Sequence, residues 1–344
     1  MHAAPFPNPS APTKPRGQEA PPALLRTRAL LLAIGLAGAA LAGWVGWRTY
    51  ADALVVERLR FGGAVADHLS RIRDHLTARE AIARAVAAAF RPPERPVPNA
   101  LEAVDPRFLD LVPDITSFVW VPRVEAGRSG EITAALAAAG LPEPAILGPA
   151  RRPLRAEEVA DRAVFPVLDI RPATPINRDS LGLDLTTLPL PRAALEAAER
   201  TRDAAATAPL ELVQLPGTRA VVLYVPVFAR AAEARPAGFV GFSYRFDRLL
   251  GAALAGAGGM PRGMPLGAPL GTTLTDAGAP EAGVLVGAGP PRPEGVVPVR
   301  HELRFGGRTW LLDYWPAADP REAARARGLL AGGIAALVIA LVFG

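Results

Sequence analysis

The chain of 344 residues contains no cysteine, only four histidines and a single lysine, Lys14. Without cysteine the protein cannot form disulfides, thiolate-bound zinc or iron–sulfur sites, or use a cysteine nucleophile. One of the four histidines, His2, lies in a proline-rich N-terminal segment, which argues against a histidine-rich metal site. The sequence therefore predicts neither a metal site nor a cofactor.

The chain also lacks a concentrated basic region. Its 38 basic residues, nearly all arginine, lie among 33 carboxylates, and no run of them interleaves with aromatic residues. Nucleic-acid-binding proteins gather basic residues on one face or in one segment. The formal net charge of +5 therefore does not predict a nucleic-acid partner. Because half of the residues are apolar, a disordered or collagen-like chain is excluded as well.

Two long apolar runs are present, and the first extends without a charged residue from Ala29 to Trp47. At about 1.5 Å per residue, a helix of this length crosses the roughly 30 Å hydrocarbon layer of a membrane. A cleaved signal peptide is the alternative, because residues 40–42 resemble a small-residue cleavage site. The apolar run continues past that site without a helix breaker, so residues 29–47 are predicted to form an uncleaved transmembrane helix.

The second apolar run covers residues 328–344 and has no polar face, as a lipid-facing helix requires. Residues 327–344 are predicted as a second, slightly short transmembrane helix whose continuation follows Gly344 in a longer protein. Four basic residues precede the first run, which places residues 1–28 in the cytoplasm as a disordered tail. The segment between the spans is then expected outside the inner (cell) membrane, in the periplasm or its equivalent.

Residues 48–91 are expected to continue the first span as a helical stalk, which Pro92 and Pro93 end. Apolar residues recur there at helical spacing and predict a stripe that faces either a folded domain or a second stalk. His68 and His75 share one face at a heptad interval; a metal pair is the alternative, but solvated histidines are the preferred interpretation. The stripe consists of Val65, Leu69, Ile72, Leu76, Ala83, Val86 and Phe90.

Between the stalk and the second span, short β-like runs alternate with helical runs, which predicts an α+β fold. A run rich in glycine, proline and alanine divides a larger subdomain, residues 92–255, from a smaller one, residues 256–326. Gly306-Gly307 predicts a tight hairpin in the smaller subdomain. Strands are expected at residues 115–124, 164–170, 210–215, 220–228, 239–246, 272–274, 283–286, 296–305 and 309–315, and helices at 125–139, 192–205 and 247–255.

No catalytic motif is found in these subdomains. A nucleophile beside a base, a carboxylate pair in a cleft or a phosphate-binding glycine loop would each leave a recognisable pattern. The chain is therefore predicted not to be an enzyme within these residues. A folded module between two spans suits sensing instead, because an external ligand can change the relative position of two membrane helices.

Several segments follow one another in the order of a known family. They are residues 115–140 (ITSFVWVPRVEAGRSGEITAALAAAG), 165–168 (FPVL) through Asn177 to 181–184 (LGLD), then 212–214 (LVQ), 223–228 (LYVPVF) and 238–241 (GFVG). Over about residues 90–255 these motifs resemble a CHASE domain. That family comprises extracytoplasmic sensors of bacterial histidine kinases, diguanylate cyclases and plant cytokinin receptors.

The resemblance implies a long stalk helix carrying two PAS-like subdomains, with a small-molecule ligand in the membrane-distal one. It also implies that the chain is the input part of a receptor of the histidine kinase or diguanylate cyclase type. Ligand binding would change how the stalk and the second span pack, across a homodimer. The alternative is an envelope protein without a sensing role, which uses the domain as a scaffold or to dimerise.

In cytokinin receptors an aspartate at the position of Asp184 hydrogen-bonds the ligand. By resemblance, Asp184 should point into a cavity enclosed by residues 164–169, 206–210 and 223–228. Four alternatives stay open: Asp184 as a turn cap, Thr207 as the start of a strand, Tyr224 as a core residue and Asn177 as loop structure. A cavity at Asp184 would favour sensing, and a solid core there would favour scaffolding. The predicted ligand-binding residues are Asp184, Leu183, Thr207, Ala206, Tyr224, Phe165 and Asn177.

Overall fold

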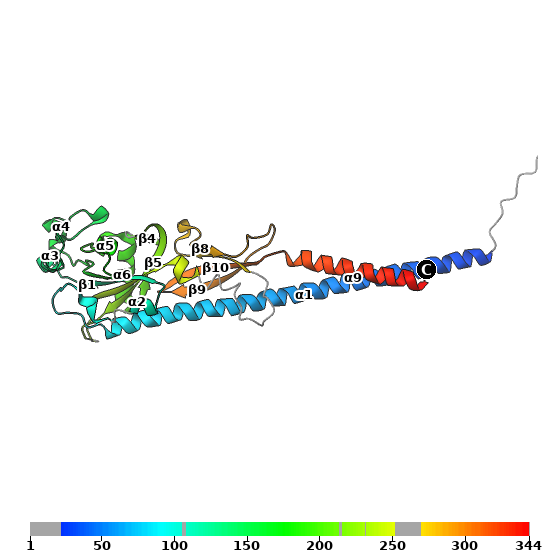
Figure 1. Cartoon of the computed structure of the whole chain (residues 1–344), viewed down its shortest axis with the longest axis horizontal. Helices are drawn as coiled ribbons and strands as arrows, with labels where there is room; N and C mark the ends of the chain where they lie inside the picture. Colours follow the sequence, from blue (N-terminus) through cyan, green and yellow to red (C-terminus); the bar gives the residue numbers. More distant parts are fainter. Residues whose placement is uncertain (1–21, 105–107, 213–214, 231, 252–269, 344) are drawn as a thin grey trace, which may run out of the picture. The chain divides into compact units, whose positions relative to one another are not determined.

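The computed structural model describes residues 22–104, 108–212, 215–230, 232–251 and 270–343. The chain forms two compact units: a helical unit, residues 1–57 and 320–344, and a sheet unit, residues 58–319. Helix α1 (Pro22–Ala89) passes from the first unit into the second, and helix α9 (Pro320–Phe343) belongs to the helical unit (Figure 1). The polypeptide therefore both enters and leaves the sheet unit through a helix.

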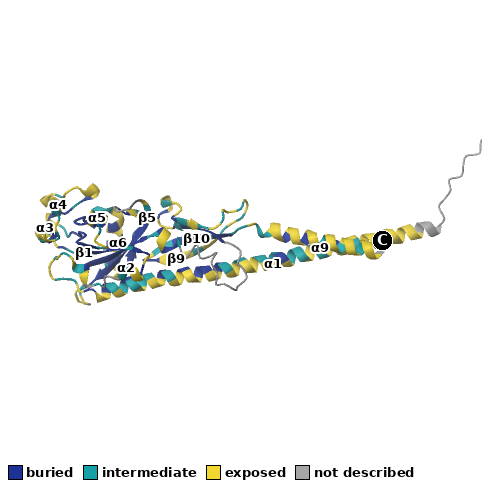
Figure 2. Ribbon diagram, in the orientation of Figure 1, coloured by how far each residue is buried: buried dark blue, intermediate teal, exposed yellow. Residues whose placement is uncertain are grey.

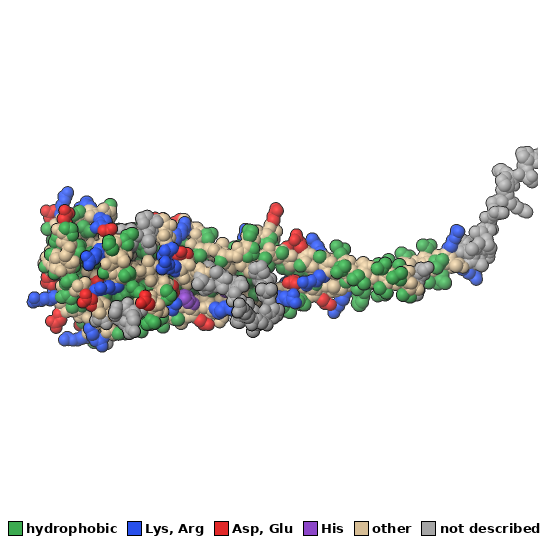
Figure 3. Space-filling model, viewed as in Figure 1, with side chains coloured by type: hydrophobic (Ala, Val, Ile, Leu, Met, Phe, Trp, Pro, Cys, Tyr) green, Lys and Arg blue, Asp and Glu red, His purple; other side chains and the backbone are tan. Residues whose placement is uncertain are grey.

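Glycine residues let the two helices of the helical unit pack closely against each other. A Cβ atom added to Gly46 would lie 2.9 Å from the carbonyl oxygen of Gly328 and 3.3 Å from the Cα of Gly332. Small residues that let backbones approach this closely are typical of helices that pack inside membranes. An ion pair between Arg327 and Glu57, 2.9 Å apart, joins the same helices. Hydrophobic side chains cover most of their visible surface (Figure 3).

Among the described residues, both helices are long and apolar enough to cross a membrane. Their bounds differ from the prediction at two places. Residues 22–28 were expected in a disordered tail but are helical, because Pro22 suits the first turn of a helix and good helix formers follow it; residues 1–21 lie outside the described residues. Helix α9 begins at Pro320, before the predicted start at residue 327, again with proline in its first turn.

The larger sheet of the sheet unit is antiparallel and, within the described residues, six-stranded. Its strand order is β2–β1–β6–β5–β3, and β4 pairs with β5 off this path. The long central strands are rich in valine and aromatic residues, which fit a buried pleated surface. The strands are β1 (Ile115–Pro122), β2 (Asp169–Arg171), β3 (Ala205–Ala206), β4 (Leu210–Leu212), β5 (Leu215–Val227) and β6 (Gly238–Arg245).

Short helices flank this sheet. Helix α6 (Pro189–Thr201) begins with proline in its first turn and buries Leu195 and two alanines on one side. The other helices in the described part of the sheet unit are α2 (Phe108–Leu111), α3 (Ser129–Ala138), α4 (Ala156–Ala160), α5 (Pro175–Arg178) and α7 (Phe246–Leu249), with 3₁₀ turns η1 (Ala100–Ala103), η2 (Pro149–Arg151), η3 (Leu185–Thr187) and η5 (Pro280–Ala282).

The smaller sheet has four strands in the part of the chain that is described, in the order β8–β7–β10–β9. The hairpin predicted at Gly306-Gly307 is confirmed: it joins β9 to β10, and both glycines adopt positive φ. Strand β10 leads through residues 317–319 into α9. The strands are β7 (Leu270–Asp276), β8 (Val286–Ala288), β9 (Val299–Phe305) and β10 (Arg308–Pro316).

The stalk, which we define as residues 58–89 of α1, packs its apolar stripe against the sheets. Of the predicted stripe all residues are buried except Val86, which is half-buried, and they belong to the same core cluster as strands of both sheets. Figure 2 shows this alternation of buried and exposed positions along the stalk. Of the two predicted surroundings for the stripe, the folded domain is therefore the correct one.

The stalk histidines were predicted to be solvated, and this is wrong for His68. His68 is buried, and its Nδ1 lies 3.0 Å from the hydroxyl of Tyr314 on β10, because the smaller sheet covers this face of the stalk. His75 is half-buried, with Nε2 3.2 Å from the carboxylate of Asp114, which also accepts a hydrogen bond from Arg79. Burial raises the pKa of Asp114, but these two hydrogen bonds outweigh it and hold that pKa below its ordinary value.

The predicted α+β class is confirmed, and two sheets stand where two subdomains were expected. Some predicted elements are shorter. The strand expected at 164–170 is reduced to β2, since residues 164–168 bond to loops through isolated bridges. The helix expected at 192–205 ends at Thr201, and β3 follows it. The predicted boundary at residue 256 and the end of the helix expected at 247–255 lie outside the described residues.

Candidate ligand-binding cavity

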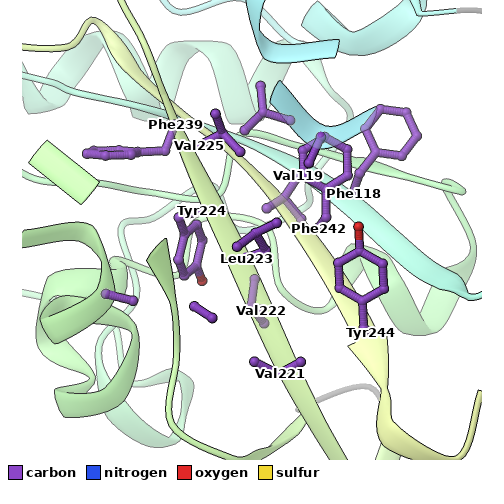
Figure 4. Packing of buried hydrophobic residues seen from close by; sticks show 14 of the residues in the cluster. Phe118, Val119, Val221, Val222, Leu223, Tyr224, Val225, Phe239, Phe242 and Tyr244 are labelled. Atoms are coloured by element: carbon purple, nitrogen blue, oxygen red, sulfur yellow. The ribbon is translucent and has the colours of Figure 1, made fainter. Parts of the chain in front are cut away.

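The two faces of the larger sheet have different surroundings. Along β5, Val222 and Tyr224 point to one face, while Leu223 points to the other together with Phe118, Phe242 and Tyr244 (Figure 4). The second set packs toward α1 and α2: Phe118 contacts Phe108, with ring centroids 5.5 Å apart. The face that carries Val222 and Tyr224 is therefore free to form a separate site.

A cavity of about 270 Å³ lies on that face. Its floor is formed by β1, β5 and β6, and its walls by β4 and by the segment that runs from Ser180 through η3 into α6. The lining residues are mainly apolar, with the hydroxyl-bearing side chains of Tyr224 and Ser243 on the floor and the exposed Glu211 on β4. The complete lining is Val119, Val167, Ser180, Leu183, Leu185, Leu188, Pro189, Leu190, Pro191, Leu210, Glu211, Leu212, Val222, Tyr224 and Ser243.

Gly241 gives the ring of Tyr224 its place. Tyr224 and Gly241 are paired across β5 and β6, and Val119 pairs with Gly241 from β1. A Cβ atom at Gly241 would lie 2.8 Å from Cε1 of Tyr224 and 2.8 Å from Cγ2 of Val119, which is too close for any other residue. The Tyr224 ring therefore packs directly against Gly241 and lines the cavity.

Burial raises the pKa of Tyr224 well above its ordinary value, so the phenol stays protonated and can donate a hydrogen bond. Within the described residues no hydrogen bond of this hydroxyl to the protein is found. A ligand with an acceptor atom at this position can accept a hydrogen bond from the Tyr224 hydroxyl.

Asp184 does not line the cavity, contrary to the prediction that it points inward. It is fully buried, and its carboxylate accepts hydrogen bonds from protein donors on all sides. Oδ1 accepts from the backbone N–H of Phe165 (3.0 Å) and from the N–H and Oγ1 of Thr186 (3.2 and 2.9 Å), and Oδ2 accepts from Nη2 of Arg162 (2.7 Å). Asp184 is the N-cap of η3, which is the turn-cap alternative.

The role of Asp184 is to position its neighbours. Leu183 and Leu185, on either side of it, both line the cavity. The backbone of this segment is held as well, because Leu185 N donates to Phe165 O at 3.0 Å and Asp184 N donates to Leu147 O at 2.8 Å. The aspartate therefore fixes one cavity wall from behind rather than contacting the space itself.

The structure brings only Leu183 and Tyr224, of the seven predicted residues, to the cavity. Thr207 is buried and bonds to both backbone groups of Val222, its Oγ1 accepting from Val222 N at 3.1 Å. Ala206 forms part of β3 and contacts Gly306. The ring of Phe165 packs on Phe239. Asn177 belongs to α5, and its Nδ2 donates to Pro172 O at 2.8 Å.

Most of the lining residues were not predicted from the sequence. Each of the three segments predicted to enclose the cavity contributes one residue: Val167, Leu210 and Tyr224. Val222 and Ser243 could have been found from the two-residue alternation of the strands, which places them on the face of Tyr224. Residues 188–191 offered no such signal, because a proline-flanked helix start has the same composition on a surface and at a cavity.

Comparison with known families decides the assignment of this chain. The family model for the CHASE domain matches residues 104–286, which is more than half of the chain. The chain belongs to the CHASE domain family. CHASE domains are extracytoplasmic and sensory, so this chain carries an extracytoplasmic ligand-sensing domain for signal transduction between two helices that could span a membrane. All of the lining residues described above fall inside the matched segment.

Two of the solved structures that match the chain are ligand-binding domains of bacterial chemoreceptors. The domain of the Pseudomonas aeruginosa PAO1 amino acid chemoreceptor PctB, in complex with L-Arg, is 12% identical, with a TM-score of 0.45 over 82% of this chain and 97% of that chain. The domain of the Pseudomonas fluorescens chemoreceptor CtaA, in complex with L-isoleucine, is 13% identical, with a TM-score of 0.30 over 85% and 97%. No curated protein sequence matches the chain. The CHASE assignment rests on the family match alone.

Proposed function

We propose that the cavity binds a small, mostly apolar molecule that presents a hydrogen-bond acceptor to Tyr224. The observation that carries this proposal is the protonated phenol on the floor of a mainly apolar, partly open cavity. The volume is near the lower end of the range of about 300–1,000 Å³ that small-molecule sites occupy. Ser243 supplies a second hydroxyl, and the exposed Glu211 can accept a hydrogen bond from a ligand N–H.

The binding test uses the full chain in detergent and a library of small apolar molecules that carry one carbonyl or ring-nitrogen acceptor. Compounds that raise the melting temperature of the wild type are then measured on Tyr224→Phe, which removes only the hydroxyl. We expect affinity to fall about 5- to 150-fold, the equivalent of one lost hydrogen bond of about 1–3 kcal/mol.

The matched control is Tyr244→Phe. Tyr244 is also buried in the same sheet but points to the opposite face. The Tyr244→Phe variant should therefore bind the same compounds as tightly as the wild type. Equal losses in both variants would show that the hydroxyl acts through stability. If no compound binds while the protein stays folded, the proposal that this cavity is the ligand site is refuted.

The chain is proposed to be the non-catalytic input part of a receptor of the histidine kinase or diguanylate cyclase type, held in the inner membrane with its sheet unit in the periplasm. The two apolar helices and the basic residues before the first of them support this topology. Reporter fusions after Arg91 should behave as exported and keep the N-terminal helix attached. Release of a soluble fragment that starts near Gly43 would refute the anchor.

We also propose a homodimer formed through the stalk. Between residues 77 and 88 the exposed residues are small and uncharged, apart from the half-exposed Arg84, which pairs with Glu80 and Asp203, whereas a solvated helix face normally carries several charges. Small side chains would allow a second stalk to approach closely. The exposed positions are Thr77, Ala78, Ala81, Ala85 and Ala88.

A further inference from the structure

We propose that Gly306, in the β9–β10 turn, is the contact through which the state of the cavity reaches the smaller sheet and the helix that follows it. This inference rests on the proposed function, since it concerns how occupancy of the same cavity is passed on. An unbroken series of contacts inside the sheet unit links the cavity floor to β10.

The first contacts join the cavity floor to strand β3. Val222 and Tyr224 line the cavity, and β5 pairs with β3 through Tyr224↔Ala205 and Leu223↔Ala206. Thr207 continues this pairing, because its N–H donates to Val222 O at 2.9 Å. A shift of β5 caused by a ligand therefore moves β3 with it.

The next contacts join β3 to the turn. β3 is the edge strand of the larger sheet, and the N–H of Ala206 donates to the carbonyl of Gly306 at 2.8 Å instead of to another strand. The N–H of Gly306 donates to Oε1 of Glu80 on the stalk. Both backbone groups of this one residue thus hold two different elements.

The fit around Gly306 leaves no spare room. A Cβ atom at this position would lie 2.5 Å from Cδ1 of Leu223, 2.6 Å from Cβ of Ala206 and 2.7 Å from the backbone nitrogen of Ala206. Leu223 is the neighbour of the two cavity residues on β5 and is fully buried. A tightly packed contact transmits displacement, because packed interiors have low compressibility.

The stalk side of the contact is anchored by a chain of ion pairs. Glu80 pairs with Arg84 at 2.9 Å, and Arg84 pairs with Asp203 at 2.7 Å, just before β3. The hydrogen bond with Asp203 raises the pKa of Arg84, and the same bond lowers the pKa of Asp203. The turn therefore sits between two elements that are already tied to each other.

Beyond the turn, β10 begins at Arg308 and runs to Pro316, shortly before α9. Phe305, next to the turn, contacts Tyr244 of the larger sheet, with ring centroids 5.6 Å apart. Strand β10 pairs with both β7 and β9 and is the central route out of the smaller sheet. A displacement that enters at Gly306 thus arrives at the strand that leads into α9.

The experiment needs no ligand, because a substitution can fill the cavity. Leu183→Phe and, as a second filler from another part of the wall, Leu188→Phe are compared with the wild type as full chains in nanodiscs. The readout is amide hydrogen exchange of residues 308–316. We expect either filler to change this exchange about fivefold or more, the lower end of measured coupling between sites. No change with both fillers would overturn the inference, while leaving the ligand screen on Tyr224 as a separate test of the proposed function.

The control lies one residue away. Gly306 and Gly307 both have positive φ, but nothing lies within 4 Å of a Cβ at Gly307. In Gly306→Ala the effect of the filler on residues 308–316 should disappear, and in Gly307→Ala it should stay as in the wild type. An equal filler effect in both variants would overturn the inference. If Gly306→Ala does not fold, a second pair of variants tests the same contact. Glu80→Ala releases the turn from the stalk and should reduce the filler effect on residues 308–316 at least about fivefold, whereas Glu80→Gln keeps an acceptor oxygen and should retain that effect. Equal filler effects in the two Glu80 variants would overturn the inference.

Discussion

Replacing Asp184 by alanine separates the two roles that this residue could have. The substitution removes the acceptor of the buried Phe165 N–H, which leaves a donor unpaired at a cost of about 1–3 kcal/mol. It also removes the N-cap of η3, at a cost of about 0.5–2 kcal/mol. The bond to Arg162 adds little, because 36% of the arginine side chain is exposed and water replaces the lost partner.

Together these losses predict that Asp184→Ala lowers the free energy of unfolding by about 1.5–5 kcal/mol, a large fraction of the roughly 5–15 kcal/mol that holds an ordinary domain folded. Asp184→Asn keeps Oδ1 as an acceptor for Phe165 and Thr186 and loses only the charged bond to Arg162, so we expect a loss of less than about 1 kcal/mol. The control is Asp179→Ala. Asp179 is exposed and pairs with Arg151 at the surface, and its removal should cost less than about 0.5 kcal/mol.

The assay is urea unfolding of the full chain in detergent, followed by tryptophan fluorescence, with ligand affinity measured on the folded fraction. If Asp184 is structural, Asp184→Ala should be the least stable variant, Asp184→Asn intermediate and Asp179→Ala the most stable. Ligand affinity should then fall only because Leu183 and Leu185 are displaced. If alanine costs less than about 1 kcal/mol but abolishes binding by the folded protein, the carboxylate is a ligand contact and the cap assignment is refuted.

Three further outcomes are expected. Because the folded state lowers the pKa of Asp114, its ionised carboxylate adds to the free energy of unfolding. This contribution is fully present above the unfolded pKa of about 3.9 and is lost as pH falls through the lower folded pKa. The acid limb of the stability curve should therefore be flatter in Asp114→Asn; an unchanged limb contradicts this. Gly46→Leu should separate α1 from α9, so that cysteines introduced into the two helices no longer crosslink. Gly43→Leu, where a Cβ meets open space, should leave that crosslink intact. Because the chain has no cysteine, Ala81→Cys should crosslink two copies through the stalk and the exposed Asp179→Cys should not; equal yields would remove the stalk dimer.

The fold class could be predicted because it depends on local patterns. The apolar stripe that contains Leu69, Ile72 and Leu76 has helical spacing, and β5 and β6 are rich in residues that fit a pleated sheet. The Gly306-Gly307 hairpin has a turn signal of its own. The burial of His68 could not be predicted in this way, since it depends on a hydroxyl of Tyr314 that is distant in the sequence.

The site was harder to predict for a related reason. A motif identifies a residue but not the direction of its side chain. Asp184 occupies the expected motif, yet Thr186 and Phe165 N–H groups lie within reach of its carboxylate and turn it away from the cavity. Leu183, one position earlier, faces the cavity instead. Such a difference of one residue is decided by hydrogen bonds to a distant loop, which no single sequence reveals.

Alternation along β5 connects ligand binding to signal transfer. Side chains of successive strand residues point to opposite faces, so Tyr224 contacts the cavity while Leu223, its direct neighbour, contacts Gly306. The two residues share one peptide unit, which is planar and cannot stretch. A ligand that displaces Tyr224 must therefore either move Leu223 or twist the strand, and pairing with β3 and β6 on both sides resists a twist. A displacement of Tyr224 at the cavity is thus passed through β5 alone to Leu223 and from there to Gly306 in the β9–β10 turn.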